Sequence, residues 1–196
     1  MNLDKLKTFA IFDEATSVTV EDIANFEKKE KCKLPEDYKK FLLEGFGGIY
    51  TPSPIHSNFY PLSEVCYFEC IKEDNIDISF PGDEDFHELN ENISFVIVGW
   101  IGQGEEELVI FTSGPYAGMT GWFIDGVAID IPGKETFSDV IDKDIIYTYV
   151  RRTQPEWQKW YHEYFTTDSS GLLLVKDPNN MPVDFEGPDL PEGFQI

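Results

Sequence analysis

The stretch Leu34–Gly48 reads LPEDYKKFLLEGFGG. Its proline, at position 35, suits the first turn of a helix, where the missing N–H is no loss. Tyr38, Phe41 and Leu42 follow at the spacing i, i+3 and i+4, so they share one narrow apolar face. The glycines at the end of the stretch stop the helix, since glycine alone enters the left-handed conformation without steric cost. The stretch therefore predicts a short helix that buries one face and belongs to the scaffold.

Two more short helices are predicted upstream of this stretch. Residues 2–12 place apolar side chains at helical spacing. In the segment ATSVTVEDIANFEKKEK, Ser17 or Thr19 can cap a helix with an acidic first turn and a lysine-rich last turn, which the helix dipole favours. Ile23 and Phe26 of this helix should face inward, toward the apolar face of the helix that follows.

The pattern changes to strand periodicity after Pro61. The segments NISFVIVGWIG, EELVIFTSG, GWFIDG and VAIDIP are rich in β-branched and aromatic residues and are separated by glycine-containing turns. Asp125-Gly126, between two short apolar runs, is the strongest local hairpin signal in the chain. The pattern predicts an antiparallel meander over residues 94–131.

The C-terminal third predicts helices followed by an irregular tail. KETFSDVID and PEWQKWYHEYF each begin a helix, the second with Pro155 in its first turn. The tail from Gly171 has one apolar run, LLLV, and then several prolines and acidic residues, which favour irregular structure. We therefore predict a single domain over residues 1–170 and an irregular tail, packed on it or extending from it, over residues 171–196.

The order of these features resembles the SUKH superfamily, which groups the bacterial Syd protein, fungal cell-wall-assembly regulators and many bacterial toxin-immunity proteins. The resemblance covers roughly residues 18–140. The features that carry it are a helix ending at Phe26-Glu27, then Leu34-Pro35, Tyr38, Phe41-Leu42, the Gly47-Gly48 stop and the meander. Members usually show Asn-Gly-Gly at that stop, whereas Phe46 precedes the glycines here. The resemblance implies an α+β fold with short N-terminal helices on a twisted antiparallel sheet, to which this chain adds a C-terminal helix and an acidic tail.

The charge of the chain limits its partners. Its 196 residues include 37 acidic and 15 basic ones, a net charge of −22. Such a surface repels nucleic acid and anionic membranes, and it attracts a basic protein. The plainer interpretation is that acidity keeps the protein soluble. An odd count of three cysteines without a C-x-x-C pair, no recognisable signal peptide and no long apolar run predict a cytoplasmic protein.

No sequence motif supports catalysis. The glycines of GWIGQGEEE precede acidic residues and a strand instead of the helix N-terminus that a phosphate site needs. The acidic loop PGDEDFHE lacks the spacing of a calcium-binding loop. His56, His87 and His162 lie in unrelated contexts, without the partners of a catalytic triad. We therefore expect no enzyme activity, no metal and no cofactor.

The candidate partner-binding residues lie in the meander. Three consecutive glutamates at one turn combine with aromatic residues at strand ends, as in an interface with an apolar anchor and charges around it. The candidates are Trp100, Glu105, Glu106, Glu107, Trp122 and Asp125. We expect the two tryptophans to lie on the same side of the sheet. The alternative is that the glutamates protect an exposed sheet edge from aggregation.

The resemblance and the charge together predict a non-catalytic binding protein. An immunity protein that neutralises a basic bacterial toxin, such as a nuclease, is the first expectation, because an acidic surface imitates the phosphate that such a toxin binds. A regulator or scaffold of the fungal or Syd type, with a housekeeping protein partner, is the alternative. The sequence predicts neither the identity of the partner nor the oligomeric state.

Overall fold

A computed structural model gives the fold of the chain. It describes residues 1–12, 17–51, 57–71, 77–79, 87–88, 92–101, 106–124, 126, 128–131, 133–167, 173–177 and 187–190. The helices are α1 (Leu3–Lys7), α2 (Val20–Glu30), α3 (Glu36–Leu43), α4 (Phe137–Val140), the π-helix η1 (Ile141–Tyr147), α5 (Thr148–Arg152) and α6 (Pro155–Tyr164). The strands are β1 (Ile11–Phe12), β2 (Ile49–Thr51), β3 (Ser57–Phe59), β4 (Cys66–Cys70), β5 (Asp77–Ser79), β6 (His87–Glu88), β7 (Ile93–Ile101), β8 (Glu106–Phe111), β9 (Thr120–Ile124), β10 (Ala128–Asp130), β11 (Phe165–Thr167) and β12 (Leu173–Val175).

The helix caps follow from the local sequence. Of the two candidate caps for α2, Thr19 is the one used: its hydroxyl accepts a hydrogen bond from the Asp22 amide, and the Asp22 carboxylate accepts one from the Thr19 amide. The same reciprocal arrangement joins Thr136 and Asp139 at the start of α4. Each pair satisfies two amides that the helix itself leaves without partners.

The apolar face of α3 is buried as predicted. Tyr38, Phe41 and Leu42 are each 0% exposed. The Phe41 ring lies 5.2 Å from the rings of Phe46 and Phe59 and 4.9 Å from that of Phe137, measured between centroids. The residue that departs from the usual Asn-Gly-Gly stop therefore fills the core beside α3.

The predicted meander is confirmed, and the fold is α+β. Strands β7, β8, β9 and β10 pair in sequence, all antiparallel. In the described residues one ten-stranded sheet runs in the order β1-β2-β3-β7-β8-β9-β10-β5-β6, with β4 also paired to β7. One pair departs from the expected antiparallel sheet, because β10 and β5 are parallel. At the expected hairpin, Gly126 has a φ of 73°, while Asp125 lies outside the described residues.

Strand β7 is the centre of the sheet. Its first half pairs with β4, its second half with β3, and its other edge with β8. The pairing with β8 is interrupted by a bulge between Ile97 and Gly99. A Cβ atom at Gly99 would lie 2.1 Å from the backbone oxygen of Asn58 on the neighbouring strand. Glycine is thus required here by the close approach of β3.

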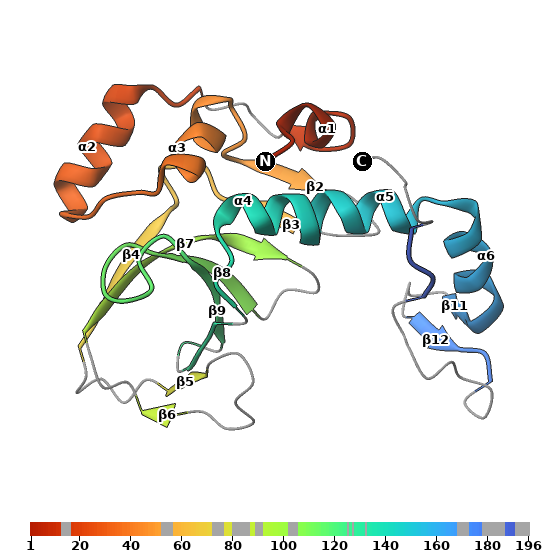
Figure 1. Cartoon of the computed structure of the whole chain (residues 1–196). Coiled ribbons are helices and arrows are strands. Elements are labelled where there is room, and N and C mark those ends of the chain that lie inside the picture. Colours follow the sequence, from red (N-terminus) through yellow and green to blue (C-terminus); the bar gives the residue numbers. More distant parts are fainter. Residues whose placement is uncertain are drawn as a thin grey trace.

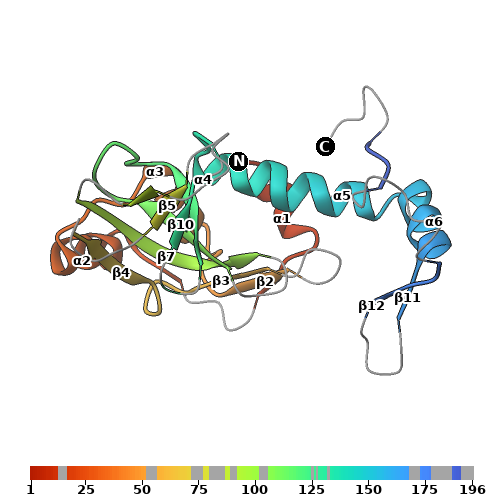
Figure 2. The same ribbon diagram turned by 90° about the horizontal axis from the view of Figure 1, so that it is seen from below.

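The sheet buries apolar side chains on both faces. On one face they pack against α1, α2, α3 and the helical rod from α4 to α5, which Figures 1 and 2 show running along the strands. Phe59, Val96, Val98, Leu108 and Ile110 are strand residues of this helix-side cluster. The other face holds a second cluster, which includes Phe95, Ile97, Val109, Phe111 and Phe123. No helical residue belongs to the second cluster in the part of the chain that the structure describes.

The C-terminal region stands beyond the end of α5. Helix α6 begins at Pro155 as predicted, and β11 pairs with β12 away from the main sheet (Figures 1 and 2). The tail expected to be irregular from residue 171 therefore contains a strand, because the backbone of residues 173–175 pairs with the strand that follows α6. Further along, Asp189 binds Arg151 at 3.1 Å, and Leu190 packs against the helix-side cluster.

Candidate partner-binding surface

The structure places four of the six candidate residues. Trp100 lies on β7, Glu106 and Glu107 on β8, and Trp122 on β9. Glu105 and Asp125 lie outside the described residues.

Trp100 and Glu107 lie side by side on the sheet face of the second cluster, to which none of the described helices contributes a residue. They are directly opposed across β7 and β8, and Glu107 is opposed in turn to Phe123 of the second cluster. Directly opposed residues share a face. The same row continues through Asn58 on β3 and Tyr50 on β2. We name these four residues, Tyr50, Asn58, Trp100 and Glu107, the open row; all four are half-buried.

The register separates Trp122 from Trp100. Trp122 opposes Leu108 and packs against the helix-side cluster, so the two tryptophans lie on opposite faces, contrary to the expectation of a shared side. The bulge between Ile97 and Gly99 is the physical reason. Strict alternation would place Trp100 with Val98 on the helix side, and the extra residue of the bulge turns it to the other face.

The sheet topology excludes one alternative for the described glutamates. Glu107 is opposed by Trp100 on one side and by Phe123 on the other, and Glu106 is opposed by Ile124. Strand β8 is therefore an inner strand, and these two side chains do not protect a sheet edge. Of the two interpretations of these glutamates, partner binding at the surface of the sheet is the one that an inner strand allows.

Tyr60 lies beside Glu107 of the open row and was not identified from the sequence. Burial raises the pKa of its hydroxyl, and the nearby Glu107 carboxylate, to which it hydrogen-bonds, raises it further. This contact joins positions 47 residues apart in the chain, so no local sequence pattern predicts it. An aromatic hydroxyl and a carboxylate thus stand together beside the Trp100 strand.

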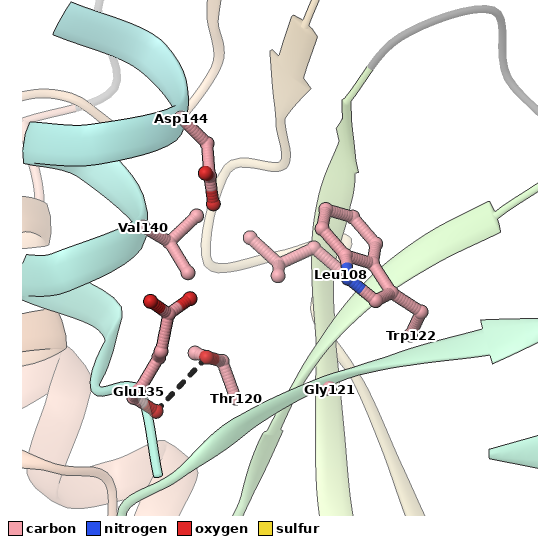
Figure 3. A pocket seen from close by; sticks show the side chains of 7 residues that line it. All are labelled: Leu108, Thr120, Gly121, Trp122, Glu135, Val140 and Asp144. Carbon is pink, nitrogen blue, oxygen red and sulfur yellow. Dashed lines mark hydrogen bonds between the residues drawn. The ribbon is translucent and has the colours of Figure 1, made fainter. Parts of the chain in front are cut away.

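Trp122 lines a pocket on the opposite, helix-covered side of the sheet (Figure 3). The pocket encloses about 190 Å³ between β8 and β9 on one side and the start of the helical rod on the other. Its lining residues are Leu108, Thr120, Gly121, Trp122, Glu135, Val140 and Asp144. Glu135 and Asp144 were not identified from the sequence, because neither belongs to a local motif. Asp144 lies on the π-helix, which has no sequence signature.

The two carboxylates of the pocket differ in their surroundings. Glu135 forms an ion pair with Lys143, at 2.7 Å. Asp144 is reached by no ion pair or hydrogen bond within the described part of the chain. Burial raises the pKa of Asp144 from 3.8 to about 6, the charge of Glu135 raises it further, and Lys143 opposes the shift. The pocket therefore holds a carboxylate that loses solvation in the fold without a compensating partner.

The raised pKa of Asp144 predicts that Asp144→Asn stabilises the protein at neutral pH. The folded state binds this proton more tightly than the unfolded state does, so the contribution of Asp144 to stability falls as pH rises from about 4 to about 6. Above pH 6 the destabilisation caused by the charged Asp144 side chain no longer changes with pH. Because the side chain keeps some contact with water, we expect Asp144→Asn to raise the free energy of unfolding by about 1 kcal/mol. This is well below the energy that corresponds to the full pKa shift.

Urea denaturation of Asp144→Asn and the unchanged protein at pH 7.5 and pH 4.5 measures this effect. The difference between them should be largest at pH 7.5 and shrink at pH 4.5. A variant that is less stable at pH 7.5 would contradict the desolvation of Asp144.

The charge of the chain is unevenly distributed. Residues 1–40 hold nine acidic and eight basic side chains, whereas residues 41–196 hold 28 acidic and seven basic ones. The first segment contains α1, α2 and most of α3, and the second contains every strand of the sheet except β1. The excess negative charge therefore belongs to the sheet and the C-terminal region.

Within the described residues, no three His, Cys, Asp or Glu side chains are grouped to hold a metal ion. None of the helices there is both long and apolar enough to cross a membrane.

The comparisons with known proteins gave one match. The family model described as the SMI1 / KNR4 family (SUKH-1) matches residues 17–179. Neither a search of curated proteins nor a search of solved structures found a match. The matched region runs from the cap of α2 through β12, and so includes the open row and the Trp122 pocket.

Proposed function

The chain belongs to the SMI1 / KNR4 family (SUKH-1), and from this premise we propose that it is a non-catalytic, cytoplasmic immunity protein that binds and neutralises a basic bacterial toxin. The open row is the observation that supports the proposal most. It presents Trp100 beside Glu107 on the sheet face of the second cluster, opposite the described helices, in a protein with a net charge of −22. A large aromatic side chain next to carboxylates suits a surface rich in lysine and arginine.

The distribution of charge supports the same proposal. An acidic surface attracts a basic toxin before contact, and such attraction accelerates association toward ~10⁸–10⁹ M⁻¹s⁻¹ at low salt. A nuclease toxin must carry positive charge to hold phosphate, so a nuclease fits this surface well. Binding over the site that holds nucleic acid would then block the toxin without any chemistry by this protein.

A regulatory or scaffold protein is the second candidate. The superfamily that the sequence resembles also contains cell-wall-assembly regulators and Syd, which favours a housekeeping protein partner. The genes beside this one discriminate between the two candidates. A toxin domain encoded next door favours immunity, and an isolated gene favours the regulatory role.

Replacing the three glutamates Glu105, Glu106 and Glu107 by glutamine is expected to slow association with the toxin encoded next to the gene by about three- to tenfold at low salt. The salt dependence of the association rate should also flatten, because fewer charges act at a distance. Trp100→Ala should instead raise the dissociation rate, by at least about tenfold, if it anchors the interface. Surface plasmon resonance across a series of salt concentrations measures both effects.

A matched control separates the position of the charges from their number. Glu69, Glu156 and Glu163 are exposed and lie on β4 and α6, away from the open row. Their triple replacement by glutamine changes the net charge equally and should leave the kinetics closer to those of the unchanged protein. Equal effects of both triple variants would refute a binding surface at Glu105, Glu106 and Glu107, of which Glu107 belongs to the open row. Failure of the unchanged protein to protect cells from the toxin would refute the immunity proposal itself.

A further inference from the structure

The Trp122 pocket has the size and lining of a site for one side chain. Its volume of about 190 Å³ is below the ~300–1,000 Å³ of typical small-molecule sites. Leu108 and Val140 form apolar walls, and the Trp122 indole lies across from the carboxylates of Glu135 and Asp144 (Figure 3). The pocket therefore combines an apolar channel with negative charge on one side only.

The charges in the pocket favour a cation. Lys143 pairs with Glu135 at 2.7 Å and offsets the charge of Asp144 only in part. A buried charge without a partner is costly, and a ligand cation would remove this cost. Asp144 lies within the seven-residue π-helix η1, and π-helical turns occur frequently at functional sites, where they aim a side chain that a regular helix would not.

The lining selects among cations. A hard metal ion gains only from oxygen ligands, and the apolar and aromatic part of this lining offers it none. An ammonium group would also gain from the charge and from the face of the indole, but it is a compact, strongly hydrated point charge and stacks on the flat ring less well than a planar cation. A guanidinium group stacks on tryptophan and matches a carboxylate in its plane, and its alkyl stem can lie against the apolar part of the lining.

We propose that this pocket is a binding site for a guanidinium group, held between the Trp122 indole and the Asp144 carboxylate. Because the pocket and the open row lie on opposite faces of the sheet, the site is independent of the surface assigned above to the toxin. The guanidinium comes either from an arginine side chain of a polypeptide or from a free small molecule such as arginine or agmatine. The two sources share the same chemistry at the pocket.

A titration followed by ¹H–¹⁵N NMR tests the site in the full chain. The probe is Nα-acetyl-arginine methylamide, and the signal is the Trp122 indole N–H, assigned by its absence from Trp122→Phe. We expect a saturable shift of this signal. The corresponding norleucine compound should give none, and the lysine compound should bind several-fold more weakly. No saturable shift with the arginine compound would overturn the proposal.

Variants of the pocket separate specific binding from general attraction to an acidic protein. Asp144→Asn should weaken binding at least about tenfold, the loss expected for a charged hydrogen bond, while Glu69→Gln on β4, outside the pocket, should leave it unchanged. Equal weakening by both variants would refute a specific site. Since Asp144→Asn is expected to be more stable than the unchanged protein, loss of binding in this variant cannot be attributed to unfolding.

The pH dependence gives a second measurement. The charged groups that face Asp144 are Glu135, which raises its pKa, and Lys143, which lowers it; the other lining side chains are uncharged. Binding should weaken several-fold between pH 7.5 and pH 5, as Asp144 takes up a proton, and this dependence should vanish in Asp144→Asn. Tighter binding of the blocked arginine than of free arginine and agmatine would identify a polypeptide as the source, and the reverse order would identify a small molecule. A pH dependence that persists in Asp144→Asn would contradict the role of this carboxylate.

Discussion

Phe41→Ala is expected to lower the free energy of unfolding by about 3–5 kcal/mol, the range for truncation of a large aromatic side chain in a core. Phe41 is 0% exposed, and outside its own helix it contacts the rings of Phe46, Phe59 and Phe137. These rings come from the loop after α3, from β3 and from α4, so the cavity would open where three parts of the fold meet. Such a cavity cannot collapse without moving one of those elements, which places the expected cost toward the upper end of the range.

Chemical denaturation of Phe41→Ala beside Phe12→Ala measures the effect against a matched control. Phe12 is 42% exposed, so the same truncation there should cost well under half as much. If the two variants lose similar stability, or if the melting temperature of Phe41→Ala is unchanged, α3 does not hold the core in the way described.

Gly99→Ala is expected to lower the free energy of unfolding by about 3 kcal/mol, the upper end of the usual range for overpacking, because its Cβ atom would lie 2.1 Å from the backbone oxygen of Asn58. The obstacle is backbone and not the end of a flexible side chain, so β3 must move away from β7 or the bulge must be lost. Either change also disturbs the register that presents Trp100 on the open row. The variant should therefore lose affinity for the partner as well as stability.

Gly118→Ala is the control for this variant. Gly118 has a φ of 86°, and an added Cβ atom there would meet no other atom within 4 Å, so only the strain of the left-handed conformation remains, about 1 kcal/mol. Thermal unfolding of both variants separates the steric clash from the dihedral strain. Equal losses at the two positions would show that the approach of β3 to Gly99 imposes no requirement for glycine.

Local features of the fold were predictable from the sequence, because they depend on residues a few positions apart. The face formed by Tyr38, Phe41 and Leu42 follows from helical spacing and is buried as expected. The order of β7 to β10 follows from short turns between alternating segments. The choice of Thr19 over Ser17 as the cap was left open, because either side chain can accept the same hydrogen bond and only the path of the chain decides.

The sequence did not predict on which face of the sheet each side chain lies, because a single extra residue in a strand moves every later side chain to the other face. Trp100 and Trp122 were expected to lie together, and the bulge between Ile97 and Gly99 separates them. The parallel pairing of β5 with β10 joins segments about 50 residues apart and depends on tertiary packing. The position of Asp144 in the same pocket as Trp122 depends on how the π-helix packs over the sheet, which local sequence does not specify.

The uneven distribution of charge makes the protein a permanent electric dipole as well as an anion. Its N-terminal helices are almost neutral, with nine acidic and eight basic residues in positions 1–40, while the remainder carries nearly all of the net charge. In the field of a cationic body a net charge produces attraction, and a dipole also produces a torque. Such a torque would turn the molecule during its approach, with its nearly neutral N-terminal helices away from the cationic body. Fewer collisions would then be spent in unproductive orientations, and the orientation at contact would be set by the chain as a whole before any single side chain touches its partner.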